Sequence, residues 1–485
     1  MSLASSARRF RVVIIGGGIT GLTACYRLSC EVQQHKLPVD ITLLEASERL
    51  GGVIKTSVQQ DFLLEHGPDC FITTKPWAVE LCEALGLSDQ LIGTTTQHRR
   101  SFILRHGRLA PVPAGFYLMA PASLGAFATS SILSWRGKFR LLGDLVVPRR
   151  SATHDESLAH FVTRRLGREA LERVAQPMVG GIYTADPEHL SMQATMPQFL
   201  DMERRHGSLI RAMLHNRRAA QHNQATTQGT SGPRYGMFVS FPQGMQTLVD
   251  SLAAHLPDQT VRLQTSVRGL QQPSTSSGWR IHLQHHPDVE ADALCLALHA
   301  PRAGQLLADT NAELSTALQD IPYASSAIVN LAYRRSDVAH PLNGMGFVVP
   351  AIEKRTIMAC SFISVKFAGR APDDHVLLRV FIGGALQSEQ YELSDHDMQH
   401  IAHQELQPLL GISDEPVYVT ISRHAQSMPQ YHLEHLQRVA GIETLANRLP
   451  GLVLAGNAYH GVGIPDCVHS GNVAAQALLK ILTDT

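Results

Sequence analysis

Residues 12–22, "VVIIGGGITGL", decide the fold, because four apolar residues run directly into three glycines. A short apolar run before a glycine turn predicts a buried strand, and residues 19–36 then place apolar side chains at helical spacing. Residues 39–46, "VDITLLEA", predict a second strand with the acid Glu45 at its end. This β-α-β order is typical of a parallel sheet that is buried on both faces.

The glycines of this turn, Gly16, Gly18 and Gly21, have the spacing G-x-G-x-x-G. Between a strand and a helix, the first allows a tight turn, the second lets a pyrophosphate approach the backbone, and the third lets helix and strand pack closely. Free N–H groups at the helix start also favour an anion. Glu45, 24 residues after Gly21, is placed to accept hydrogen bonds from ribose hydroxyls. A structural glycine turn with a chance acid is the alternative, and the strand–turn–helix context favours a dinucleotide site.

The next residues favour FAD over NAD. In "EASERLGGVIKTS", residues 45–57, Arg49 can neutralise a pyrophosphate and the pair Gly51–Gly52 lets more backbone approach it. This stretch resembles the R-x-G-G signature of flavin-containing amine oxidases, which often continues with an arginine where this chain has Val53. Near the C-terminus, residues 452–478 predict a strand, two glycine turns and a helix, with Asn457 where many relatives have an acid. Both ends of the chain therefore build one site for non-covalent FAD.

The residue identities in several motifs indicate one branch of this superfamily. "EHGPDCF" (65–71), "GGIYTADPEHLS" (180–191), "MPQYHLEH" (428–435) and "GVGIPDC" (461–467) resemble the oxygen-dependent protoporphyrinogen oxidase family, which includes coproporphyrinogen III oxidases. The resemblance covers nearly the whole chain. It implies dehydrogenation of a porphyrinogen to the porphyrin by three hydride transfers to flavin N5, with O2 as acceptor and H2O2 as product, in heme biosynthesis. Because the flavin carries the chemistry, we expect no catalytic side chain.

The resemblance also implies which residues make contacts. To FAD we assign the two glycine loops, the acid, the arginine and the C-terminal turn: Gly16, Gly17, Gly18, Ile19, Thr20, Gly21, Glu45, Ala46, Arg49, Gly51, Gly52, Gly67, Pro68, Val267, Gly456, Val462, Gly463 and Ile464. To the substrate we assign a propionate-binding cation and an apolar slot: Arg100, Gly181, Phe347, Val348 and Phe381. The family commonly has its arginine where this chain has Ser101, so Arg100 is preferred over Arg99 as the nearer residue. No metal site is expected.

We therefore expect an α/β fold, with a discontinuous Rossmann-like FAD-binding domain, an inserted mixed-sheet substrate domain and a helical subdomain. The FAD-binding parts are residues 1–95, 236–310 and 441–485, the substrate parts 96–112 and 311–440, and the helical part 113–235. Residues 155–175 predict a helix. The polar residues 214–234 predict a loop or a partly disordered linker.

Composition limits the partners. The 485 residues carry 42 basic and 42 acidic side chains, so net charge gives no case for nucleic acid. Seven scattered cysteines and the lack of an apolar leader fit a cytoplasmic protein. The uncharged residues 109–135 are either a buried, pocket-lining segment or a surface that dips into one leaflet. Beyond a tetrapyrrole and O2, the sequence leaves open a peripheral contact with the cytoplasmic membrane face, a homodimer and hand-over of product to ferrochelatase.

Two other functions stay open on the same fold. An amine oxidase would need an aromatic cage near the flavin, and the C-terminal turn offers only Tyr459 as an aromatic. A carotenoid desaturase would need a long apolar tunnel. A non-enzymatic prenyl-GTPase escort protein shares the fold without using flavin, and the intact glycine loops argue against it. The sequence does not distinguish protoporphyrinogen IX from coproporphyrinogen III as the substrate.

Overall fold

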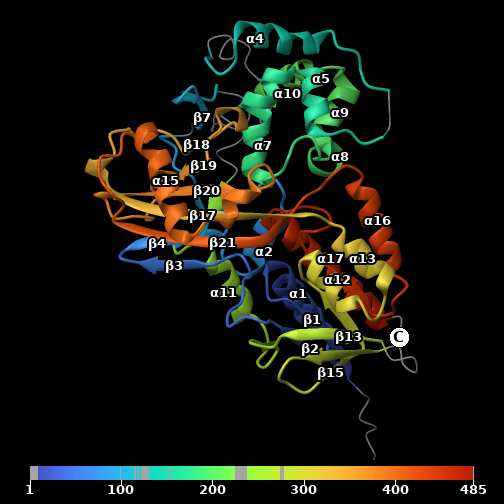
Figure 1. Ribbon diagram of the computed structural model, residues 1–485. Helices are drawn as coiled ribbons and strands as arrows, with labels where there is room; N and C mark the ends of the chain where they lie inside the picture. The colour runs from blue at the N-terminus through green and yellow to red at the C-terminus, as the bar shows by residue number, and fades with distance from the viewer. Residues whose placement is uncertain are drawn as a thin grey trace, which may run out of the picture.

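The computed structural model describes residues 9–98, 100–113, 116–117, 120–121, 130–151, 154–223, 238–272 and 278–483. In Figure 1 a parallel sheet with its helices lies at the bottom, a larger mixed sheet lies in the middle and a group of helices lies at the top. The chain leaves the lower layer and returns to it twice, so this layer is built from distant segments.

The lower layer is a five-stranded parallel sheet with the order β12-β2-β1-β16-β22. Its strands are Val261–Arg262, Val39–Leu44, Phe10–Ile15, Ala293–Leu296 and Leu452–Leu454. Strand β1 is central because its partners β2 and β16 lie on either side of it. The predicted discontinuous Rossmann-like sheet is confirmed, while the domain boundaries given above stay a prediction.

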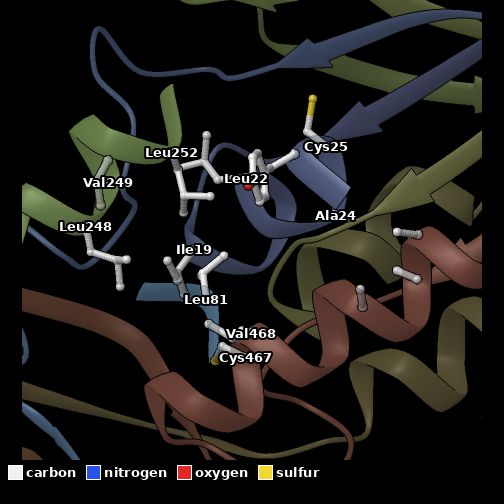
Figure 2. Packing of buried hydrophobic residues seen from close by; sticks show 14 of the residues in the cluster. Ile19, Leu22, Ala24, Cys25, Leu81, Leu248, Val249, Leu252, Cys467 and Val468 are labelled. Carbon is white, nitrogen blue, oxygen red and sulfur yellow. The ribbon is translucent and has the colours of Figure 1, made fainter. Parts of the chain in front are cut away.

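Strand β1 is buried on both faces, as its apolar run predicts. Val12 and Ile14 pack into one cluster and Val13 and Ile15 into another, because successive side chains of a strand point to opposite faces. Figure 2 shows the first cluster, with labels on residues that four helices contribute to it. These helices are α1 (Ile19–His35), α2 (Trp77–Ala84), α11 (Gln246–Ala254) and α17 (Ile464–Thr483). The second face is covered by three strands and three helices: β13 (Val267–Gln271), β14 (Trp279–Leu283), β15 (Val289–Ala291), α12 (Ala300–Leu307), α13 (Ala312–Gln319) and α16 (His435–Ala446).

The middle layer is a seven-stranded sheet with the order β21-β17-β20-β19-β18-β7-β8. Its strands are Tyr418–Pro429, Tyr323–Arg334, His375–Gly383, Ile357–Phe362, Gly346–Val348, Phe102–Arg105 and Arg108–Pro111. All neighbours are antiparallel except β18 and β7, so the sheet is mixed, as expected. Helix α15 (Asp395–Leu410) packs on one face through a core that includes Phe347 and Phe362. The other face is turned toward the lower sheet and the upper helices.

The upper helices have a hydrophobic core of their own. They include α4 (Trp135–Leu142), α5 (Leu158–Arg165), α7 (Gln176–Tyr183), α8 (Met192–Thr195), α9 (Pro197–His206) and α10 (Leu209–Asn223). The predicted helix 155–175 is interrupted, because Gly167 adopts a positive φ of 94° after α5 and two short helices follow, α6 (Arg168–Ala170) and η3 (Leu171–Ala175). The predicted linker 214–234 is wrong for its first part, which is the end of α10. Buried Leu209, Ile210 and Met213 anchor that helix, and the polar residues extend it. Residues 224–234 lie outside the described residues.

The uncharged stretch 109–135 is described only in part. Strand β8 ends at Pro111, and two short strands, β9 (Phe116–Tyr117) and β10 (Ala120–Pro121), pair with each other. Residues 122–129 lie outside the described residues, so both interpretations of this stretch stay predictions. In the part of the chain that the structure describes, every helix is too short or too polar to cross a bilayer.

Candidate functional site

Two glycines, one in the loop after β1 and one in the first turn of α1, have no room for a side chain. Gly16 has a φ of 110°, and a Cβ on it would collide with the carbonyl of Ala297. A Cβ on Gly21 would collide with the carbonyl of Gly16, because the helix crosses the end of the strand at that point. Both positions therefore fix the approach of α1 to the sheet.

Gly18 is different, because nothing in the protein requires it. Its φ of −72° and ψ of 175° suit any residue, and a Cβ there would have no heavy atom within 4 Å. Gly18 is also the N-cap of α1, and no side chain caps the helix. The first N–H groups of α1 thus open onto free space, which is the arrangement that suits a phosphate group approaching the backbone.

The second glycine pair lies against the first loop. Gly51 pairs with Gly18 in a parallel bridge, and its N–H donates to the carbonyl of Gly17 over 2.8 Å. The Arg49 side chain donates to the carbonyls of Gly52 and Ile54, and none of the ion pairs found among the described residues includes it. Burial lowers the pKa of Arg49, while Glu45 and Glu48 act in the opposite direction. The arginine therefore brings a positive charge beside the two glycine loops without a direct ion pair among the described residues.

Glu45 sits where β2 ends and is held against the same loop. Its Oε2 accepts the N–H of Gly17 over 2.7 Å, and its Oε1 accepts the N–H of Ser47 over 2.8 Å. The side chain is half-buried, and the next residue, Ala46, is exposed. Each carboxylate oxygen keeps a further lone pair, so the group can still accept bonds from a bound ribose.

The second glycine-rich segment, residues 456–463, leads from β22 into α17. Gly456 has a φ of 133° and Gly461 a φ of 151°, values that side chains rarely allow. The N–H of Gly456 donates to Ser470 Oγ over 2.9 Å, so the segment is tied to the helix that follows it. Helix α17 crosses α1 so closely that a Cβ on Gly471 would lie 2.6 Å from the carbonyl oxygen of Thr20. The structure thus brings the two predicted ends of the cofactor site together.

A charged cluster lies beside Gly67 and Pro68. Asp69 pairs with Lys366 over 2.6 Å and with Arg379 over 3.6 Å, and Arg379 also donates to the carbonyl of Gly67. Burial opposes the ionisation of Asp69, but the two cations outweigh it and hold its pKa below the usual range. The sequence interpretation missed Lys366 and Arg379. A charged residue inside the apolar run "HVLLRVFIGG" was the signal that could have indicated Arg379.

The predicted substrate residues fall into different places. Phe347 is 2% exposed and packs edge-on against Phe362 in the core under α15. Val348 points to the opposite face, where a Cβ on Gly181 would lie 3.8 Å from its Cγ1. Phe381 is half-buried, with the guanidinium of Arg379 5.1 Å from its ring centre. The structure therefore brings Gly181 and Val348 together and places Phe347 on the far side of the sheet.

Arg100 is exposed at the start of β7, and only its backbone has defined partners, His98 and Met345. Arg99 lies outside the described residues. The remaining predicted cofactor residues flank the loops already described: Ile19, Thr20 and Ile464 open the two helices, Val462 and Gly463 precede α17, and Val267 begins β13.

A small pocket, with a cavity volume of about 30 Å³, lies between α7 and the segment that joins β18 to β19, and Gly181 is part of its wall. Its lining is mostly apolar or small: Gln176, Pro177, Gly180, Gly181, Thr184, Ala185, Val349, Pro350, Ala351, Arg355, Ile357, Met358, Leu386 and Gln387. These residues include no carboxylate, histidine or lysine, and their one cation, Arg355, pairs with Glu405 over 3.1 Å. The wall is suited to orienting an apolar ligand rather than to proton transfer.

A parallel sheet with two glycine loops, a carboxylate at the end of β2 and an arginine beside both loops is the arrangement of a dinucleotide-binding flavoprotein. The residues fit FAD, since the space beside Gly18 and the free N–H groups of α1 are what a pyrophosphate needs. A family model for flavin containing amine oxidoreductases matches residues 19–479. The chain therefore belongs to the flavin-containing amine oxidoreductase family, and it is an FAD-dependent oxidoreductase, as predicted.

Individual relatives agree over almost the full length. The chain is 34% identical over 473 residues to the coproporphyrinogen III oxidase of Bacillus subtilis (strain 168), covering 97% of this chain and 98% of that protein. It is 30% identical over 493 residues to the protoporphyrinogen oxidase of Homo sapiens, with coverage of 96% and 98%. A crystal structure of "Putative protoporphyrinogen oxidase" from Exiguobacterium sp. 255-15 superimposes with a TM-score of 0.85 at 32% identity, covering 99% of this chain and 100% of that one. The resemblance inferred from the motifs is confirmed.

Proposed function

We propose that the protein dehydrogenates a porphyrinogen to the porphyrin, with O2 as the final acceptor. The observation that carries the proposal is the pocket beside α7, because the motif most specific to the resemblance, residues 180–191, forms part of its wall through Gly181. An apolar lining without acid–base groups is what a reaction driven by the cofactor requires. The names of the full-length relatives support the same substrate class.

The residues of the chain have binding and orienting roles in this proposal. Bound FAD supplies the hydride acceptor. Gly18, Gly51 and Arg49 hold its pyrophosphate and Glu45 its ribose, while the cluster of Asp69, Lys366 and Arg379 stiffens the segment at Gly67. Gly181 and Val348 form an apolar wall that keeps water from the reacting carbon. Fixing the macrocycle in one orientation is the main contribution that such a site makes to the rate.

For the substrate itself we favour coproporphyrinogen III. The chain is 35% identical over 501 residues to the coproporphyrinogen III oxidase of Propionibacterium freudenreichii subsp. freudenreichii, covering 98% of this chain and 91% of that protein. This identity and the 34% for the B. subtilis protein exceed the 30% for the human protoporphyrinogen oxidase. Four propionates would also need cations, and the exposed Arg100, beside the start of β18, is our candidate for one of them.

The test is anaerobic reduction of the FAD-loaded protein by each porphyrinogen in turn. We expect coproporphyrinogen III to bleach the flavin absorbance fastest, and air to restore it with release of H2O2. If benzylamine or putrescine bleaches the flavin and neither porphyrinogen does, the protein is an amine oxidase instead. Arg100→Ala should lower kcat/KM for coproporphyrinogen III about ten- to a hundredfold without changing the FAD content.

Exposed apolar residues on α4 support a peripheral membrane contact as part of the proposal. Trp135 and Phe139 lie one helical turn apart with 68% and 71% of their surface exposed, and Arg136 lies between them. An aromatic face with a basic neighbour suits the interface of an anionic bilayer. Co-sedimentation with anionic liposomes tests this, and recovery in the supernatant at low salt would reject it.

A homodimer and hand-over of product to ferrochelatase stay expectations, which size-exclusion chromatography and channelling assays would test.

A further inference from the structure

One motif of the sequence, "MPQYHLEH", has no role in the site described so far. It spans the end of β21 and the start of α16, and its tyrosine, Tyr431, is 1% exposed. The Tyr431 hydroxyl donates to the carbonyl of Asn457 over 2.6 Å and accepts the N–H of Gly461 over 2.7 Å. One hydroxyl therefore bridges the two sides of residues 456–463, the segment in front of α17.

A second side chain of the same motif holds the middle of that segment. His435 is buried and its Nε2 lies 3.0 Å from the carbonyl oxygen of Tyr459. Burial lowers the pKa of His435 to about 4, so the ring is neutral at pH 7 and its Nε2 must carry the proton to donate to the carbonyl. The ring also stacks on Tyr431 with 3.9 Å between the ring centres. Two stacked rings thus satisfy three backbone groups of the segment.

The same short motif also contacts the end of α7, the helix that lines the pocket, and Ser191. The carbonyl of Tyr431 accepts the N–H of Ser191, and the Gln430 side chain donates to the carbonyl of Tyr183 at the end of α7. Helix α7 carries Gly181. Tyr431 therefore has hydrogen bonds on two sides. Its carbonyl accepts from Ser191, and its hydroxyl binds the glycine segment.

We propose that Tyr431 is a positioning residue that keeps residues 456–463 in the conformation that binds FAD. This rests on the proposed assignment of Gly456, Val462 and Gly463 to the cofactor. The segment contains glycines with φ values of 133° and 151°, and free chains with such glycines populate many conformations. If the segment adopts its FAD-binding conformation for only a fraction of the time, the apparent affinity for FAD is reduced by that fraction. The Tyr431 hydroxyl removes this cost because it is hydrogen-bonded to Asn457 and Gly461 before the cofactor binds.

The test compares Tyr431→Phe with Tyr333→Phe as a matched control. Tyr333 is also fully buried and bonded through its hydroxyl, but to His403 on the α15 side of the middle sheet. We expect Tyr431→Phe to raise the Kd for FAD about tenfold, the size expected when buried partners lose a hydrogen bond. Tyr333→Phe should bind FAD as the wild type does. In the free protein, amide hydrogen exchange of residues 457–463 should rise only in Tyr431→Phe, and added FAD should slow it.

Equal Kd values for the wild type and both variants, or an equal increase in both variants, would overturn the proposal. If Tyr431→Phe does not fold, amide exchange of the free wild type decides, because the N–H of Gly461 should already be protected before FAD is added. Exchange of that N–H as fast as in an unstructured peptide would then overturn the proposal. FAD binding is measured without any porphyrinogen, so a wild type that binds FAD and oxidises no porphyrinogen would reject the proposed function alone.

Discussion

The two glycine-rich loops in front of α1 and α17 are built in different ways. The first, residues 16–18, is shaped mostly by its own β-α-β unit, because the carbonyl of Gly16 requires Gly21 and Glu45 accepts the N–H of Gly17, while only Gly16 is required by a distant residue, Ala297. The second, residues 456–463, is held by side chains from elsewhere, including Tyr431 and His435. A loop that is fixed by its neighbours in sequence can be recognised from a short motif. A loop that is fixed from a distance depends on the rest of the fold.

The largest effect, on both stability and FAD binding, is expected at Gly21, where α1 packs against the first loop. Gly21→Val places a branched side chain against the carbonyl of Gly16 and pushes α1 off the sheet. Overpacking of this kind costs about 3 kcal/mol or more, so the free protein should unfold at a lower denaturant concentration and purify without FAD. Denaturation of the apoprotein measures this. A variant as stable as the wild type would show that the first loop is not self-contained.

A change at Gly18 should separate binding from folding. A Cβ at Gly18 has no protein atom within 4 Å, so the apoprotein of Gly18→Val should be close to the wild type in stability, while the side chain fills the space for the pyrophosphate. We expect FAD affinity to fall at least about a hundredfold, because the phosphate can no longer reach the helix N–H groups. The FAD affinity of Gly18→Ala should lie between those of the wild type and Gly18→Val. Normal flavin content in Gly18→Val would remove this loop from the cofactor site.

Glu45→Ala should have a smaller effect on the same loop. It removes the ribose acceptor and leaves the N–H of Gly17 without its partner. A hydrogen bond to a charged group contributes roughly 1.5–3 kcal/mol, which predicts about a ten- to hundredfold rise in the Kd for FAD. The exposed neighbour Glu48 provides the control, since Glu48→Ala should bind FAD normally. Equal titration curves for both variants would contradict the role of Glu45.

The smallest effect is expected at the anchor between the second loop and its own helix. Ser470→Ala removes one hydrogen bond to the N–H of Gly456. A single neutral bond contributes about 1 kcal/mol, so FAD affinity should change fivefold or less. An effect larger than that of Tyr431→Phe would mean that the second loop is held mainly from within, as the first one is. Fluorescence titration with FAD compares the two variants directly.

The same contrast explains what the sequence could and could not predict. The β-α-β unit, its glycines and Glu45 were predictable because they depend on neighbours within one short stretch. Phe347 and Val348 were both assigned to the substrate, but neighbours on a strand face opposite ways, and only the packing of α7 and α15 shows which face is which. The ion pair of Asp69 with Lys366 joins positions 297 residues apart, a contact that only the complete fold brings together. The end of α10 was misassigned because polar composition was weighed above the apolar anchor before it.

The central place of β1 has a consequence for how the protein is made. One of its flanking strands, β2, follows at once, but the other, β16, is synthesised about 280 residues later, as the contact between Arg11 and Asp292 shows. At the usual ~5–20 residues per second this leaves one edge of β1 unpaired for roughly 15–60 s on the ribosome. Helix α17, which covers α1, comes later still. The nascent chain must therefore keep an apolar strand edge from aggregating, and the proposed second half of the cofactor site is incomplete until α17 has left the ribosome.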